Sequence, residues 1–266
     1  MREISSKNNS IVKLCRQLSL KKYRERFSKY LIEGDNILNE ALKNHARIDA
    51  ILISRGCEKK LEKLLDPPDK ILLETKTFVL GKELFDSMCQ TETSQGILAI
   101  VSKKDYSIEK LKESKSGNVV VLDRLQDPGN IGTIIRTADA AGYGAVICIK
   151  GTGDVFSPKV VRAATGSLFR MPVVFMDSPK ELVEFTGAAG KKLVSTCLDT
   201  DHFYYEEDLK NNIALVIGNE GNGISQDLID SSDIKIKIPM EGSIESLNAS
   251  VAAGILMYES MRKERG

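Results

Sequence analysis

A short run near the C-terminal end of the sequence places the strongest constraint on the fold. Residues 213–225 read Ile-Ala-Leu-Val-Ile-Gly-Asn-Glu-Gly-Asn-Gly-Ile-Ser. Five consecutive apolar residues predict a buried strand. Glycines at 218, 221 and 223 then interrupt it, and glycine lets a backbone turn sharply or lie close against a ligand. The run therefore predicts a core strand that ends in a loop suited to hold a ligand.

A second strand and loop follow directly. Residues 234–239 alternate apolar and polar side chains until Pro239 stops the pattern. Residues 240–248 then lead into an amphipathic helix, expected from 249 to about 262. Ligands bind at the strand ends of open α/β sheets, so the two loops are candidates for one site. Either loop alone could be an ordinary turn, and Ser246 and Asn248 could be helix caps that serve stability only.

Alternating strand and helix patterns fill the rest of the chain in two blocks. In residues 1–105 we expect strands at 30–34, 50–54, 71–73 and 97–101, and helices at 11–18, 35–42, 58–65 and 82–89. A polar linker is expected at 106–116, with a helical stretch at 108–112. In residues 117–266 we expect further strands at 118–122, 145–149, 172–175 and 192–198, and helices at 130–141, 159–165 and 180–186. This order predicts the α/β class, with a mainly parallel sheet in the second block.

The charge of the chain is distributed unevenly. Residues 1–105 carry 20 Lys and Arg against 15 Asp and Glu, a balance of +5, and the remaining residues carry 18 against 22, a balance of −4. The first thirty residues alone hold nine basic and two acidic side chains. Such a bias favours a polyanionic partner at the N-terminal end. A solvated helix face would give the same pattern.

Several familiar chemistries lack their sequence signatures. The dinucleotide-binding, P-loop and nucleophile-elbow glycine motifs are missing. His45 and His202 lie outside the glycine-rich loops, which argues against histidine catalysis and histidine metal sites. Five widely spaced cysteines without a Cys-x-x-Cys pair indicate neither zinc nor disulfides. We expect no metal, no membrane segment and no signal peptide, and therefore a cytoplasmic protein with reduced thiols.

A third polar motif lies at the expected helix 130–141. Asn130 is at its start, as its expected cap, and Arg136 lies off the stripe formed by the isoleucines and Ala138. Arg136 could therefore project into a cleft, where a guanidinium suits phosphate. It could equally be a surface residue paired with Asp139 three positions later.

Together the three stretches resemble the SpoU, or TrmH, branch of the SPOUT methyltransferases. The stretches are 127–139, 217–225 and 238–252, and their order and spacing match that family over about 150 residues. Residues 30–34 and 93–98 are similar to the small RNA-binding domain, akin to ribosomal protein L30e, that precedes many such enzymes. The resemblance implies a SPOUT α/β-knot with a C-terminal trefoil knot, acting as a homodimer through residues 117–266. It implies transfer of a methyl group from S-adenosyl-L-methionine to a ribose 2′-hydroxyl of RNA, with residues 1–105 binding the RNA.

The same resemblance implies roles for individual residues. Arg136 is expected to act on the 2′-hydroxyl, and because a guanidinium stays protonated we expect it to clamp phosphate and stabilise the developing alkoxide rather than act as a base. The other residues expected at the catalytic centre are Asn130, Glu220, Ser246 and Asn248. Those expected around the cofactor are Gly218, Asn219, Gly223, Ile238, Met240 and Leu247.

Three alternatives stay open at this point. The substrate could be transfer RNA, although the separate N-terminal domain favours ribosomal RNA. The chain could be a non-catalytic RNA-binding or assembly protein of the same fold. It could also methylate a base, as another SPOUT branch does.

Overall fold

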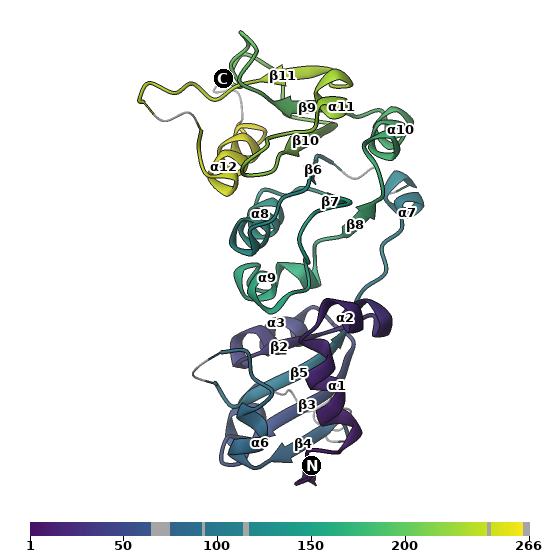
Figure 1. Ribbon diagram of the computed structural model, residues 1–266, viewed down its shortest axis with the longest axis vertical. Helices are drawn as coiled ribbons and strands as arrows, with labels where there is room; N and C mark the ends of the chain where they lie inside the picture. The colour runs from purple at the N-terminus through teal and green to yellow at the C-terminus, as the bar shows by residue number, and fades with distance from the viewer. Residues whose placement is uncertain (65–74, 92–93, 114–116, 244–245, 263–266) are drawn as a thin grey trace. The chain divides into compact units, whose positions relative to one another are not determined.

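The computed structural model describes residues 1–64, 75–91, 94–113, 117–243 and 246–262. The chain forms two compact units, each with its own sheet (Figure 1). Unit 1 contains Met1–Lys104 and also Phe156–Arg162, and unit 2 contains Asp105–Val155 and Ala163–Gly266. No helix among the described residues is both long enough and apolar enough to cross a membrane.

Unit 1 is built on a mixed five-stranded sheet. Its strands lie in the order β1-β4-β3-β5-β2, and β5 runs antiparallel to both β2 and β3. The strands are β1 (Arg2–Ile4), β2 (Lys29–Glu33), β3 (Ile48–Ser54), β4 (Thr77–Leu80) and β5 (Ile97–Ser102). The helices are α1 (Ser10–Leu18), α2 (Lys21–Phe27), α3 (Asp35–Lys43), α4 (Glu58–Leu64) and α6 (Lys82–Asp86). Val12, Leu52, Phe85 and Ile100 are among the side chains of its core.

Two strands of unit 1 have no signal in the local pattern. β1 has three residues, two of them exposed and charged, and it exists because it pairs with β4. β4 is only four residues long and is completed by parallel pairing with β3. The strand expected at 71–73 lies outside the described residues. The helix expected at 82–89 is shorter and ends at Asp86.

Unit 2 has a fully parallel six-stranded sheet, which confirms the predicted architecture. Its order is β11-β9-β10-β6-β7-β8. The strands are β6 (Val119–Leu122), β7 (Ala145–Ile149), β8 (Val173–Met176), β9 (Lys192–Thr196), β10 (Ile213–Ile217) and β11 (Ile234–Ile236). Because β10 lies between β9 and β6, the loops after these three strands leave the sheet at the same edge.

Short helices connect the strands of unit 2. They are α7 (Ile108–Glu113), α8 (Pro128–Ala140), α9 (Pro158–Ala163), the 3-10 helix η1 (Ser167–Phe169), α10 (Pro179–Ala189), α11 (Gln226–Asp230) and α12 (Ala249–Glu259). Residues of α9 up to Arg162 group with unit 1. This helix ends before the expected position because Thr165 and Gly166 both have positive φ angles, 49° and 88°, which a right-handed helix cannot contain.

Candidate cofactor and catalytic site

The glycine-rich loop after β10 folds back on itself. A Cβ atom at Gly218 would lie 2.4 Å from the backbone carbon of Gly223 and from the nitrogen of Ile224, so only glycine fits there. Asn219 and Gly223 exchange backbone hydrogen bonds of 3.0 and 2.9 Å. The Asn219 side chain accepts the N–H groups of Gly221 and Asn222, each at 3.0 Å. These contacts fix the loop as a tight turn at the sheet edge.

The two residues that follow β6, Asp123 and Arg124, anchor this loop through hydrogen bonds. Asp123 is fully buried and accepts the Ser225 N–H at 2.6 Å and both arms of the Arg124 guanidinium, at 3.0 and 3.1 Å. The Arg124 carbonyl accepts the Asn219 side-chain amide at 2.9 Å. Arg124 has a φ angle of 57°, an uncommon backbone conformation for a non-glycine residue. The sequence signal for this anchor is an Asp directly after a fully apolar strand, and it was not among the predicted site residues.

The start of α8 differs from the sequence prediction. The residue that caps the helix is Asp127, whose side chain accepts the Asn130 N–H at 2.8 Å. Asn130 was predicted to be the cap, and that assignment is wrong. Proline at 128 opens the first turn, where its missing N–H costs nothing. Since Asp127 caps the helix, the Asn130 side chain is free to bond elsewhere.

Asn130 joins the three sequence motifs in one hydrogen-bond network. Its amide donates to Glu220 Oε1 at 3.1 Å, and its Oδ1 accepts the Asn248 amide at 3.0 Å. Glu220 also accepts the backbone N–H groups of Asp127 at 2.9 Å and Gln126 at 3.1 Å. The side chain of Asn130 is buried, only 7% exposed. The structure therefore brings Asn130, Glu220 and Asn248 together at one place.

The ionisation of Glu220 follows from these partners. Burial tends to raise the pKa of Glu220, but the N–H groups of Asp127 and Gln126 and the Asn130 amide outweigh it and hold the pKa below its ordinary value. Glu220 is thus a carboxylate at neutral pH. It can accept hydrogen bonds and orient its donors, but it carries no proton to give.

Asn248 has two tasks at once. Its Oδ1 caps α12 by accepting the N–H groups of Ser250 at 3.0 Å and Val251 at 3.3 Å. Its amide nitrogen is directed to Asn130. The cap proposed from the sequence is real, and the same side chain also belongs to the network.

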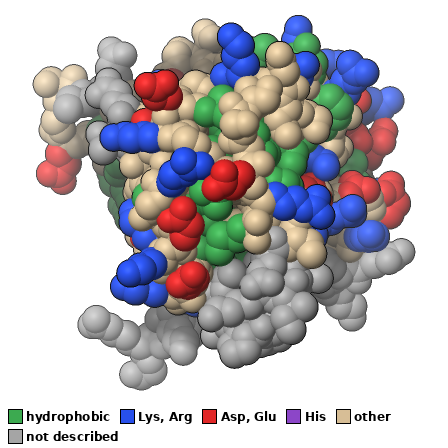
Figure 2. Space-filling view, turned by 90° about the horizontal axis from the view of Figure 1, so that it is seen from below, with side chains coloured by type: hydrophobic (Ala, Val, Ile, Leu, Met, Phe, Trp, Pro, Cys, Tyr) green, Lys and Arg blue, Asp and Glu red, His purple; other side chains and the backbone are tan. Residues whose placement is uncertain are grey.

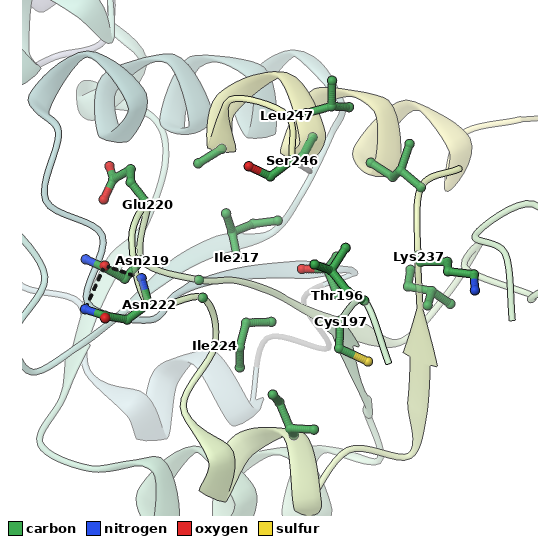
Figure 3. Close-up of a pocket in the computed structure, with 18 of the residues that line it drawn as sticks. Thr196, Cys197, Ile217, Asn219, Glu220, Asn222, Ile224, Lys237, Ser246 and Leu247 are labelled. Carbon is green, nitrogen blue, oxygen red and sulfur yellow. Dashed lines mark hydrogen bonds between the residues drawn. The ribbon is translucent and has the colours of Figure 1, made fainter. Parts of the chain in front are cut away.

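A cavity of about 740 Å³ lies beside the glycine loop. Figure 3 shows it between Asn219, Glu220 and Asn222 on one side and Thr196, Cys197 and Lys237 on the other, with Ser246 and Leu247 along a third wall. All six residues predicted to surround a cofactor line it, namely Gly218, Asn219, Gly223, Ile238, Met240 and Leu247. Of those predicted at the catalytic centre, Glu220, Ser246 and Asn248 line it as well. The segment 196–199 after β9 also contributes and was not predicted.

Arg136 is not part of this lining. It lies on the exposed side of α8, and its side chain makes no hydrogen bond or ion pair with any residue that the structure describes. The alternative that it pairs with Asp139 is wrong, because Asp139 binds Ser167 and Arg170 instead. The structure thus leaves this guanidinium available at the surface, away from the cavity wall of its own chain.

The cavity has the composition of a nucleoside-sized ligand site. Pockets for such ligands typically occupy about 300–1,000 Å³ and combine apolar walls with a few polar groups. Here the walls include Ile217, Ile224 and Ile236. Polar residues come from the glycine loop and from the segments around Thr196, Lys237 and Ser246. No group of three metal-ligating side chains occurs within the described residues. The size and lining of the cavity fit an organic cofactor such as S-adenosylmethionine.

Known proteins resemble the chain over its whole length. A family model described as the SpoU rRNA Methylase family matches residues 117–258, and one described as the MRM3-like substrate binding domain matches residues 9–99. The 23S rRNA (guanosine(2553)-2′-O)-methyltransferase RlmP of Bacillus subtilis is 38% identical, over 97% of this chain and 98% of its own.

Two solved structures extend the comparison. The AdoMet-bound rRNA methyltransferase from Sinorhizobium meliloti superposes with a TM-score of 0.87 at 29% identity, covering 97% of each chain. A structure titled for the 2-OH methylation of C/U34 on tRNA gives a TM-score of 0.51 at 28% identity and covers 55% of this chain and 94% of its own.

Proposed function

The chain belongs to the SpoU rRNA methylase family, and on that premise we propose that it methylates a ribose 2′-hydroxyl of ribosomal RNA with S-adenosylmethionine, using the cavity beside Gly218 to hold this cofactor. The observation that carries the proposal is the network in which Asn130 links Glu220 to Asn248. Through Asn130 at the start of α8 it ties together two walls of the cavity, the glycine loop at Glu220 and the segment at Asn248. Rigid placement of reacting groups is the main service a protein can give to such a transfer.

We assign the cofactor to the glycine loop and the two segments facing it. Gly218 permits close approach of the backbone, and Ile238 and Leu247 supply apolar surface with exposed main-chain groups. Asn219, Gly223 and Met240 complete this part of the lining. When bound, S-adenosylmethionine supplies the methyl group that is transferred. Its methyl carbon is reactive because it is attached to a positively charged sulfur.

Arg136 is the residue we assign to the RNA. Its guanidinium stays protonated, so it cannot accept the proton of the hydroxyl. It can bind a phosphate of the target with two donors and stabilise negative charge that develops on the ribose oxygen. Ser246 and the Glu220–Asn130–Asn248 network hold the opposite side of the site, with Glu220 as a permanent acceptor.

We propose a homodimer through unit 2. Leu247, Val251, Tyr258 and Met261 are exposed apolar side chains along and beside α12. Successive members are four, seven and three residues apart, which keeps them on one helical face, and an exposed apolar stripe of this kind marks an interface. Arg136 lies outside the lining of the cavity in its own chain. In a dimer, Arg136 of one protomer could therefore act at the cavity of its partner. We also propose that unit 2 contains the C-terminal trefoil knot that the family resemblance implies.

We propose that residues 1–105 bind the RNA substrate and that residues 117–266, after the linker 106–116, form the catalytic domain. Figure 2 shows, on one face of the molecule, Lys and Arg side chains interspersed with acidic ones. We therefore expect RNA to bind at a local cluster of Lys and Arg side chains. We favour the cluster formed by three exposed residues of α2, namely Lys21, Lys22 and Arg26. Lys22 Nζ lies 4.9 Å from the ring centre of Tyr23, and Arg26 Cζ lies 5.6 Å from that of Phe27. Cations beside aromatic rings suit the phosphates and bases of RNA.

Ribosomal RNA is favoured over transfer RNA by the extent of the similarities. RlmP and the Sinorhizobium meliloti enzyme, named for ribosomal RNA alone, match both units, whereas the structure named for tRNA alone covers 55% of the chain. RlmP matches from end to end, which supports a nucleotide of large-subunit RNA as the target. We place the reaction in the cytoplasm, where such RNA resides and where the five free thiols would stay reduced.

The direct test is methyl transfer in vitro. The purified protein is incubated with methyl-labelled S-adenosylmethionine and either deproteinised ribosomal RNA or total tRNA, and digests are resolved into nucleosides. We expect label in a 2′-O-methyl nucleoside from ribosomal RNA. Label confined to tRNA or to a modified base would refute the proposal, and no cofactor binding in calorimetry would favour a non-catalytic RNA-binding protein.

A further inference from the structure

Asp139, which lies about one helical turn after Arg136 on α8, forms an ion pair with Arg170. Asp139 Oδ2 accepts the Ser167 hydroxyl at 2.7 Å and the Arg170 guanidinium at 3.0 Å from Nε and 2.7 Å from Nη2. The side chains of Asp139 and Arg170 are 21% and 39% exposed. Three donors on one carboxylate oxygen hold Asp139 firmly toward η1.

Spacing alone would give Asp139 a different partner. Side chains three positions apart are neighbours on a helix, and Asp and Arg at that spacing commonly pair. Asp139 is three residues after Arg136, yet within the described part of the chain the Arg136 side chain has no hydrogen-bond or ion-pair partner. Asp139 binds Arg170 instead.

We propose that Arg170 is a positioning residue that occupies Asp139 and so keeps Arg136 available for RNA. The inference depends on the role of Arg136 in the proposed function. Arg170 does not touch the reacting atoms in this assignment. It acts by giving Asp139 two charge-assisted hydrogen bonds, from Nε and Nη2 to the same oxygen Oδ2, which hold the carboxylate toward Arg170.

Charge counting leads to the same result. Arg136, Asp139 and Arg170 together carry a net charge of +1, so the surface around Arg136 attracts a phosphate. Without Arg170 the remaining pair is neutral, and Asp139 is free to neutralise the guanidinium directly. A phosphate would then have to compete with a carboxylate already attached to the same helix.

The backbone fixes Arg170 in this place. The consecutive positive φ angles of Thr165 and Gly166 turn the chain after α9. As a result η1 packs on α8, with Ser167, Leu168 and Phe169 all buried. A β-branched residue such as Thr165 rarely adopts a positive φ angle, and such strain persists only where the surrounding structure imposes it. Arg170 follows η1 directly, so its guanidinium reaches α8 at Asp139.

The test compares four variants by steady-state methyl transfer to ribosomal RNA. For Arg170→Leu we expect kcat/KM for RNA to fall about fivefold, the factor set by a surface ion pair that must first be broken. The dissociation constant for S-adenosylmethionine should not change. Arg170→Lys keeps a cation at this place and should retain most of the activity. Lys150→Leu, which removes an exposed partner of Asp177 in the same unit, is the matched control and should behave as the wild type.

The deciding variant combines Arg170→Leu with Asp139→Asn. It removes the carboxylate that would capture Arg136, so we expect kcat/KM to return to within about twofold of the wild type. A purely structural role for the ion pair predicts the opposite, because the second change cannot rebuild that ion pair. The inference is overturned if Arg170→Leu is as active as wild type, or if the double variant is no better than the single one.

A parallel measurement separates this inference from the proposed function. If Arg136→Ala retains full transfer, the role of Arg136 itself is wrong and the inference falls with it. If Arg136→Ala is inactive while Arg170→Leu is unaffected, only the positioning role of Arg170 is refuted. Melting temperatures of all variants identify any that fail to fold.

Discussion

At the scale of single residues, the site depends on side chains that each satisfy more than one neighbour. Glu220 accepts three donors from the segment 126–130, and Asn248 both caps α12 and donates to Asn130. Glu220 and Asn248 are exposed, but Asn130 between them is buried, and a buried amide is costly to leave without its partners. Conservative substitutions here should therefore have effects beyond the single hydrogen bond that they remove.

Glu220→Gln tests the network through its charge. Glutamine offers one acceptor oxygen and turns an amide toward backbone donors, so we expect methyl transfer to fall about tenfold or more. The pKa of Glu220 is lowered by its partners in the fold, so its contribution to stability is present above the unfolded pKa and is lost as pH falls through the folded pKa. Melting temperatures should therefore hold from pH 8 to about 5 and drop below about pH 4.5 more in the wild type than in Glu220→Gln. Equal acid sensitivity in both proteins would contradict this account.

Gly218→Ala tests the tight turn beside the cavity. The new Cβ would meet backbone atoms at 2.4 Å, which neither neighbour can avoid without moving the loop. We expect a loss of about 1–3 kcal/mol in unfolding free energy and at least tenfold weaker cofactor binding. Gly221→Ala is the control for stability, since its Cβ would have only the Asn219 oxygen nearby, at 3.7 Å. Should both alanines give the same melting temperature, steric exclusion at position 218 is not the explanation.

At the scale of elements, strand order explains what local patterns could not reveal. The apolar run 213–217 was predicted within its observed bounds, because five buried residues carry their own signal. β1 was missed because only its pairing with β4 makes it a strand. The same reason hides the anchor at Asp123, which reaches Ser225 across 102 positions of sequence. Asn130 was identified as a site residue but given the wrong local task, because Asp127 and Asn130, three positions apart, could both cap α8 and pattern alone does not choose between them.

The helix α2 carries the prediction for RNA binding. Replacing Lys21, Lys22 and Arg26 by alanine should weaken binding to ribosomal RNA and reduce the slope of log K against log salt by about 0.7–0.9 for each phosphate that the variant no longer binds. Cofactor affinity should stay as it is. The control replaces three exposed lysines of unit 2, Lys150, Lys180 and Lys192. A salt slope that changes as much in the control as in the α2 variant would exclude a specific role for this helix.

At the scale of the whole molecule, two units divide recognition from chemistry in the proposed function. Each has its own core, so changes in one should leave the other folded. The family resemblance in the sequence indicated this division and nine of the residues that line the cavity. It could not reveal that Arg136 lies outside the lining or that Asp139 is taken by Arg170, since both follow from tertiary packing around α8.

Val251→Asp tests the association of two copies. A charge in the middle of the apolar stripe on α12 should shift the molar mass in light scattering from twice the 29.3 kDa of one chain toward that value. Transfer activity should fall with it. Phe175→Asp is the matched control, because Phe175 is equally exposed, at 56% against 51%, but lies on the edge strand β8. A dimer that survives the first change and dissociates with the second would move the interface to that edge.

The hydrogen bonds between Asn130, Glu220 and Asn248 also have a consequence for biosynthesis. The three side chains are spread over 118 positions, so the network can form only after the last of them, Asn248, has emerged from the ribosome. A nascent chain can form unit 1 and even the first strands of unit 2 well before that moment. The binding pocket for the methyl donor closes last, so an unfinished polypeptide that already touches RNA is still unable to modify it.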